Sequence, residues 1–191
     1  MWWLAVPIGT SVAGIVFAIL LAQWVLGNDT GTPQMRKISD AIFTGAQAYL
    51  KRQYRTITIL AVVVAIVLGG LLAAFSKTNP VQTAIETAIS FAIGAFCSGL
   101  AGYIGMQVAV RSNIRTASAA RRGLGDALMV SLRGGAVSGF MVIALSLLGV
   151  SVVFLIFNAV GGSNSGILIT PRNIVGFAFG ASFVALFAQL G

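Results

Sequence analysis

Few residues in this chain of 191 could take part in chemistry. The acidic residues are Asp29, Asp40, Glu86 and Asp126, the single cysteine is Cys97, and histidine is absent. Metal sites of the cysteine–histidine type and Ser–His–Asp hydrolysis both need histidine, and the four acidic residues are scattered along the sequence. We therefore predict that this chain contains no catalytic residue and no metal ligand.

The composition instead indicates a protein dissolved in lipid. Hydrophobic residues make up 58% of the chain and charged residues 8%, and the mean hydropathy is +0.96. A soluble domain would carry about a quarter charged residues. The net charge of +8 is typical of nucleic-acid-binding proteins, but the cations are dispersed among apolar segments. We expect no nucleic-acid partner, and basic loops that face membrane lipid.

Five apolar segments are long enough to cross a bilayer, which takes about 20 residues in a helix. They cover residues 2–26, 56–75, 87–110, 134–157 and 174–191. Residues 36–55 show three- and four-residue periodicity, which predicts an amphipathic cytoplasmic helix that runs into the second span. This helix either supports a catalytic or gating region or anchors the chain at the lipid surface. The predicted fold class is an all-α integral membrane protein with five transmembrane helices.

The loops between these segments alternate in charge. Residues 27–55 and 111–133 each carry five cationic residues, whereas residues 76–86 and 158–173 carry one each. Cytoplasmic loops are the ones enriched in lysine and arginine. We therefore expect the N-terminus outside and the C-terminal end at the cytoplasmic face. The arginines of "RSNIRTASAARRG" either steer an anionic substrate or fix topology and contact lipid headgroups.

Small residues recur every four positions on three of the segments. They are Gly94, Ser98 and Gly102 on the third, Gly135 and Gly139 on the fourth, and Gly176 and Gly180 on the fifth. Such spacing lets helix backbones approach closely in lipid. The pattern predicts a tightly packed bundle but does not distinguish a channel, a pump or a scaffold.

Three stretches resemble the membrane-bound, ion-pumping inorganic pyrophosphatases. They are "AIFTGAQAYLKRQYRTITIL", "GYIGMQVAVRSNIRTASAARRGLGDALMVSLRGGAVSGF" and "GFAFGASFVALFAQLG", in the same order along the chain. The resemblance implies a homodimer whose subunits have about sixteen transmembrane helices, each long enough to cross the bilayer. It also implies hydrolysis of pyrophosphate with Mg²⁺ at the cytoplasmic ends of an inner helix ring, coupled to outward transport of H⁺ or Na⁺.

The same resemblance implies that the catalytic carboxylates lie elsewhere. In the family, the segment that matches "ALFAQLG" continues into a catalytic run containing lysine and aspartate. We therefore expect an N-terminal fragment of about a quarter of the pump, inactive alone, from a prokaryotic plasma membrane. It would supply four outer helices and one inner helix. The alternative is a small stand-alone membrane scaffold, assembly partner or passive channel.

One position in this chain can be matched to the family's ion pathway. Gln189 stands where many family members have an arginine, at the head of the ion path. An amide can hold a water molecule or pair by hydrogen bonds, but it lacks the charge that shifts the pKa of a neighbouring carboxylate. The alternative is a glutamine that only packs between helices.

Overall fold

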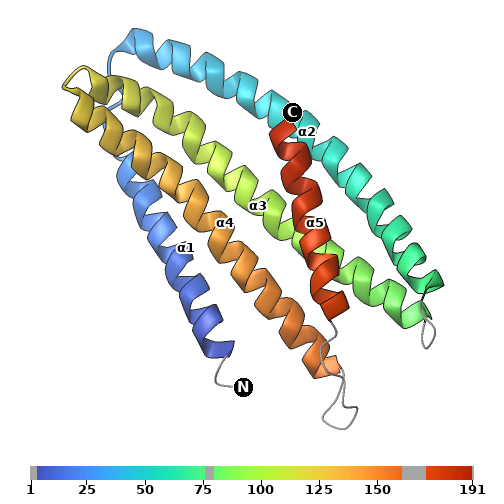
Figure 1. Ribbon diagram of the computed structural model, residues 1–191. Coiled ribbons are helices and arrows are strands. Elements are labelled where there is room, and N and C mark those ends of the chain that lie inside the picture. Colours follow the sequence, from blue (N-terminus) through green and yellow to red (C-terminus); the bar gives the residue numbers. More distant parts are fainter. Residues whose placement is uncertain (1–3, 76–79, 161–170, 191) are drawn as a thin grey trace. The chain divides into compact units, whose positions relative to one another are not determined.

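The described part of the chain is helical. The computed structural model describes residues 4–75, 80–160 and 171–190, with side chains described except at 158–160, 171–173, 189 and 190. Figure 1 shows the five helices, α1 (Ala5–Leu26), α2 (Pro33–Ala74), α3 (Pro80–Ala120), α4 (Leu124–Val160) and α5 (Pro171–Leu190). The predicted all-α fold with five helices is confirmed.

Three of the helices are much longer than a membrane span. α2 has 42 residues, α3 has 41 and α4 has 37. At 1.5 Å per residue, α2 is about 63 Å long, against about 30 Å for the hydrocarbon core of a bilayer. Helices α1 to α4 are each long and apolar enough to cross a membrane, and residues 174–188 form a shorter apolar helix. The predicted amphipathic segment and second span are parts of the single helix α2.

Local sequence signals fix where the helices begin and end. Thr32 precedes Pro33, and the Thr32 hydroxyl accepts a hydrogen bond from the Met35 amide at 3.3 Å. Proline suits the first helical position because its missing N–H would have no partner there. At the end of α1, the Asn28 side-chain amide donates to the Trp24 carbonyl at 2.7 Å. These caps bracket the turn between α1 and α2.

The chain forms two compact units, which we describe separately. Unit 1 comprises Met1–Gly9, Gln53–Leu100 and Leu145–Gly191. Unit 2 comprises Thr10–Arg52 and Ala101–Ala144.

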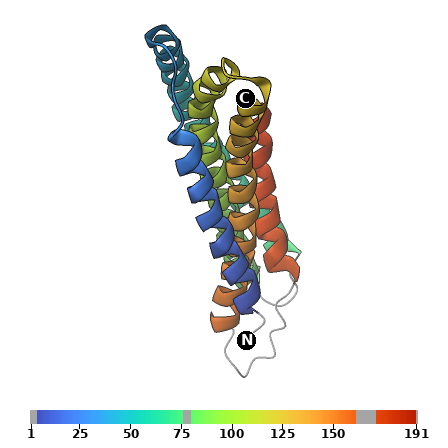
Figure 2. The same ribbon diagram turned by 90° about the vertical axis from the view of Figure 1, so that its left-hand side faces the viewer.

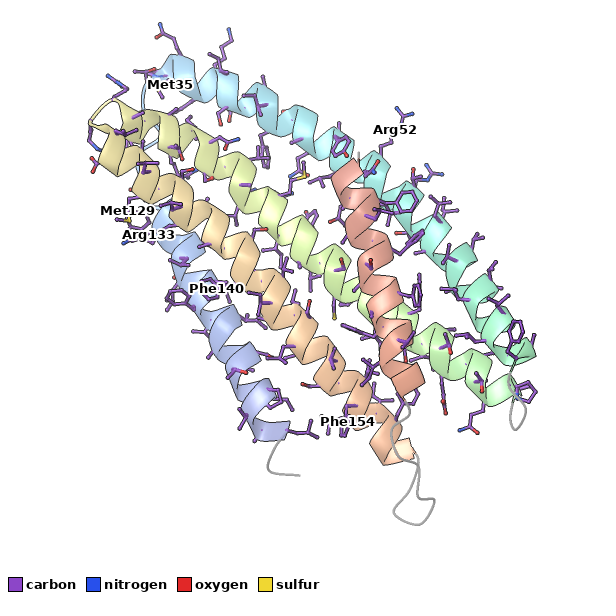
Figure 3. The ribbon with its side chains drawn as sticks, viewed as in Figure 1. Met35, Arg52, Met129, Arg133, Phe140 and Phe154 are labelled. Carbon is purple, nitrogen blue, oxygen red and sulfur yellow. The ribbon has the colours of Figure 1, made fainter. Side chains whose placement is uncertain are left out.

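In unit 2, α1 lies alongside α4, as Figures 1 and 2 both show. The rings of Phe17 and Phe140 meet edge to face with their centroids 4.8 Å apart. The Arg133 guanidinium carbon lies 4.0 Å from the centroid of the Trp24 ring. Figure 3 shows Arg133 and Phe140 along the edge of α4 that faces α1. Aromatic contacts and a cation–π contact therefore join these two helices.

In unit 1, α5 packs directly on the backbone of α3. A side-chain carbon added at Gly94 would collide with the carbonyl oxygen of Phe177, and one added at Gly180 with that of Phe91. The two glycines thus allow backbone-to-backbone contact, as predicted for these two small-residue patterns. The prediction was wrong for Gly135 and Gly139 of α4, because an added carbon at either would meet no described atom within 4 Å.

The apolar half of α2 is largely uncovered by protein. Large apolar side chains there are between 52% and 68% exposed, namely Ile59, Val62, Val63, Ile66, Val67 and Leu71. A continuous apolar surface of this kind would promote aggregation in water. Contact with lipid or with further protein explains it.

Substituting Gly180 tests the backbone contact. We expect Gly180→Ala to destabilise the protein by about 1–3 kcal/mol, because the new methyl group must push α5 away from α3. Thermal unfolding in detergent measures this. The control is Gly70→Ala, whose methyl group enters open space on α2. Equal unfolding temperatures for the two variants would contradict the close approach.

Candidate functional site

Three helices of unit 1 meet where two consecutive side chains of α2 bind the backbones of its neighbours. The Tyr54 hydroxyl donates a hydrogen bond to the Gly99 carbonyl of α3 at 2.8 Å. The Gln53 side-chain amide Nε2 donates to the Phe187 carbonyl of α5, also at 2.8 Å. We call Gln53, Tyr54, Gly99, Val184 and Phe187 the α2–α3–α5 junction.

Glycine at position 99 allows the junction to close. A side-chain carbon added there would lie 3.7 Å from Tyr54 Cε1 and 3.8 Å from Val184 Cγ1, so a methyl group would fill the space. A larger side chain would separate the tyrosine from the carbonyl that it reaches. Val184 is buried, and beside it on α5 the ring centroids of Phe183 and Phe187 lie 4.7 Å apart. Apolar packing therefore surrounds the two polar contacts.

Both hydrogen bonds use a neutral donor and a backbone carbonyl. A helical carbonyl has two lone pairs, so it can accept from a neighbouring helix as well as from its own. In lipid, a polar side chain is costly unless it finds such a partner. Interhelical hydrogen bonds in membranes contribute roughly 0.6 kcal/mol on average and up to about 2 kcal/mol. The junction thus holds three helices together without any charge.

The junction lies next to the predicted ion-path residue in the sequence. Gln189 belongs to the last turn of α5, two residues after Phe187. Its side chain lies outside the part of the structure that is described, so its predicted role stays a prediction. The Gln53 contact does fix the turn of backbone that leads to it.

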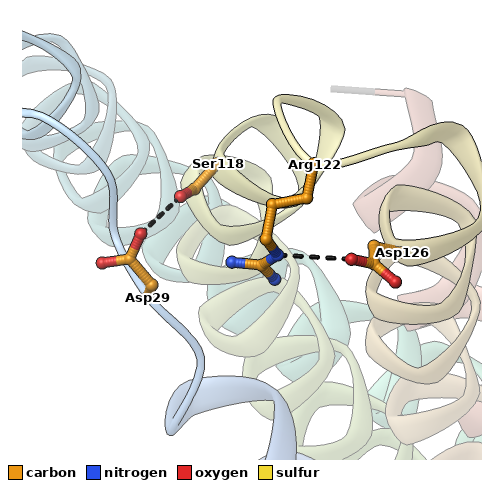
Figure 4. Close-up of polar contacts among 4 residues, drawn as sticks. All are labelled: Asp29, Ser118, Arg122 and Asp126. Atoms are coloured by element: carbon orange, nitrogen blue, oxygen red, sulfur yellow. Dashed lines mark hydrogen bonds and ion pairs between the residues drawn. The ribbon is translucent and has the colours of Figure 1, made fainter.

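A second polar cluster lies in unit 2, where the turn between α1 and α2 meets α3. Figure 4 shows the Ser118 hydroxyl donating to a carboxylate oxygen of Asp29, at 2.7 Å. Gly31 lies in the same turn with a φ of 70°, a conformation that side chains disfavour. The Ser118 hydrogen bond, followed by the Gly31 amide, lowers the pKa of Asp29 below its ordinary value. Asp29 is thus held ionised by hydrogen bonds.

The arginines of the basic loop contact the protein itself. Arg115 donates from Nε to the Leu26 carbonyl at 3.0 Å and from Nη1 to the Arg111 carbonyl at 2.6 Å. Partial burial and the nearby Arg111 lower the pKa of Arg115. Arg122 forms an ion pair with Asp126 at 3.2 Å (Figure 4). The Arg115 contact with Leu26 ties α1 to α3. Whether the loop arginines steer an anionic substrate or fix topology and contact headgroups stays a prediction.

The described acidic residues do not fit a magnesium site. Mg²⁺ needs oxygen ligands that converge on one point. Asp29 accepts from Ser118, Asp126 pairs with Arg122, and Glu86 accepts from the Gln82 amide at 2.7 Å. Among the residues whose positions are described, no three acidic, cysteine or histidine side chains gather.

Comparison with known proteins identifies the family. Residues 12–191 match the family model described as inorganic H⁺ pyrophosphatase. The chain belongs to this family. It is 46% identical over 195 residues to the K(+)-insensitive pyrophosphate-energized proton pump of Caldanaerobacter subterraneus subsp. tengcongensis, with 99% of this chain aligned. It is 50% identical to K(+)-insensitive pyrophosphate-energized proton pump 2 of Moorella thermoacetica, with 93% of this chain aligned. It is 38% identical to pyrophosphate-energized membrane proton pump 3 of Arabidopsis thaliana, with 94% of this chain aligned.

The aligned chain accounts for 27%, 25% and 24% of these three inorganic H⁺ pyrophosphatases. It therefore spans about a quarter of the length of the curated relatives that it matches. Together with the long apolar helices, membership of this family makes the chain an integral membrane protein.

Gln53 and Tyr54 were not among the residues predicted from sequence. Both lie within "KRQYR", where cations of the amphipathic helix meet the apolar run of α2. Two neutral polar residues at that boundary were the only local signal. Their partners are 134 and 45 residues away in the sequence, so helical periodicity does not reveal the contacts.

Removing the Tyr54 hydroxyl tests the α2–α3 contact. We expect Tyr54→Phe to lower the free energy of unfolding by about 1 kcal/mol, because the Gly99 carbonyl loses an interhelical donor. Thermal unfolding in lipid nanodiscs measures the loss. Thr58→Val is the control, since the Thr58 hydroxyl bonds only within α2, to the Tyr54 carbonyl. Equal effects would show that the contact does not join the helices.

Removing the Ser118 hydroxyl tests the second cluster. We expect Ser118→Ala to raise the pKa of Asp29, because the largest cause of its lowering is lost. A lowered folded pKa stabilises the protein above the unfolded value of about 3.9, and this contribution disappears as the pH falls below it. Carboxyl NMR titration of Asp29 measures the change. The control is Ser131→Ala, at an exposed serine of α4, which should leave the titration of Asp29 unchanged. If Asp29 titrated in Ser118→Ala as it does in the wild type, the contact would be contradicted.

Proposed function

We propose that this chain forms the N-terminal membrane part of a pump that couples hydrolysis of pyrophosphate to outward transport of protons. The observation that carries the proposal is the match of residues 12–191 to the inorganic H⁺ pyrophosphatase family. The relatives aligned above are named as proton pumps, which favours H⁺ over Na⁺ as the transported ion. Two of them are named K(+)-insensitive, so we also propose that transport does not require potassium.

We further propose how the chain lies in the membrane. The cationic loops at 27–55 and 111–133 support a cytoplasmic position for both, with the N-terminus outside and the end of α5 at the cytoplasmic face. The apolar segments at 2–26, 56–75, 87–110, 134–157 and 174–191 would be its membrane spans. By family resemblance, the complete pump would be a homodimer, and we place it in a prokaryotic plasma membrane.

The proposed contribution of this chain is structural. Its four acidic residues are separated, and Asp29, Glu86 and Asp126 are engaged with other partners, so Mg²⁺ and pyrophosphate would be bound by the rest of the pump. The chain would supply packed helices around the reaction centre and, at Gln189, a neutral residue of the ion path. The α2–α3–α5 junction supports this role because it holds the turn that carries that residue.

Reconstitution of the complete polypeptide that contains this chain tests the proposal. With pyrophosphate and Mg²⁺ outside, we expect proteoliposomes to acidify internally at equal rates in sodium and potassium buffers. A protonophore should abolish the acidification. The 191-residue chain alone should hydrolyse no pyrophosphate, because it lacks convergent carboxylates. Sodium uptake that persists with the protonophore would identify a sodium pump, and hydrolysis by the chain alone would overturn the structural role.

A further inference from the structure

We propose that Gln53 is a positioning residue for the ion path, which it serves by fixing the last turn of α5. This inference rests on the proposed function, since it concerns how the pump holds residue 189. Gln53 would touch neither the ion nor the substrate. It acts through the backbone, by the hydrogen bond from its Nε2 to the Phe187 carbonyl at 2.8 Å.

The contact is placed where it can hold the last turn of α5. Lower on the helix, Gly180 lies against the backbone of α3 at Phe91. Phe187 lies seven residues further along α5, which corresponds to about 10 Å at 1.5 Å per residue. It is held there by α2. Contacts with α3 already position α5 between Gly176 and Val184, and the Gln53 hydrogen bond extends this support to the last turn. Without Gln53, α5 would keep its contacts with α3, while its last turn would lose the hydrogen bond to α2.

The contact also acts on local helix geometry. Phe187 belongs to the last turn of α5 as the structure describes it, where carbonyls lack a partner within the helix, so the Gln53 amide supplies that partner. Phe187 precedes Gln189 by two residues, within the same turn. A change at position 53 should therefore loosen the turn of backbone that carries residue 189.

Neighbouring contacts separate this role from general packing. Tyr54 anchors α2 to α3 through Gly99, so α2 keeps its place when Gln53 is replaced. The aromatic rings of Phe183 and Phe187 provide apolar contact at the same level, which does not depend on the amide. Loss of the amide donor alone should loosen one turn and leave the helix bundle assembled.

The test measures coupling in the complete pump. We expect Gln53→Met, which keeps the side chain's length and removes its donor, to lower the ratio of proton transport to pyrophosphate hydrolysis about threefold or more. The KM for pyrophosphate should stay at the wild-type value. Gln82→Met is the matched control, since Gln82 is exposed and bonds within α3.

Hydrogen–deuterium exchange of the α5 peptide provides a readout that does not need activity. In Gln53→Met we expect faster exchange of the amides near Phe187 and unchanged exchange near Phe177. Faster exchange with unchanged coupling would overturn the positioning role, as would unchanged exchange. If the wild-type pump transports no protons, the proposed function fails together with this inference, and the exchange data then show separately whether Gln53 holds the turn.

Discussion

The crossing of α5 on α3 is the contact on which the arrangement of unit 1 depends. Gly94 and Gly180 each face a backbone carbonyl of the other helix, so neither position has room for a side-chain carbon. In lipid the hydrophobic effect does not drive helices together, and close backbone contact supplies the attraction by dispersion. Because this crossing fixes the distance between the helices, Val184 can reach Gly99 and Phe187 can reach Gln53.

The two units are stabilised by different chemistry, and the difference follows from their sequences. Unit 1 combines close glycine contacts with hydrogen bonds from the neutral side chains Gln53 and Tyr54. Unit 2 holds α1 against α3 and α4 with arginines, through carbonyl contacts of Arg115 and the stacking of Arg133 on Trp24. A charged side chain is costly in the hydrocarbon and stable where water or headgroups solvate it, so the cations gather beyond the apolar runs. The same distribution underlies the proposed orientation.

The helices could be predicted from sequence because apolar runs and helical periodicity are local properties. The amphipathic segment 36–55 and the apolar segment 56–75 were read correctly as parts of one helix, α2. Which glycines make contact could not be predicted, since Gly94 and Gly139 both belong to four-residue patterns of small residues, and among the described residues only Gly94 meets another helix. The contact between Gln53 and Phe187 could not be predicted either, because a contact between residues distant in sequence depends on how the helices pack. Gln189 came from family resemblance alone.

A neutral anchor suits a helix that carries part of an ion path. In the proposed pump, a charged side chain at position 53 would attract or repel the transported proton and shift the pKa of groups near it. The amide of Gln53 does not titrate, so it can fix α5 without exchanging protons. The carbonyl that it binds belongs to the backbone, which no side-chain substitution removes. In the proposed pump, the residue at the predicted head of the ion path could then vary between arginine and glutamine while the helix that carries it stays in place.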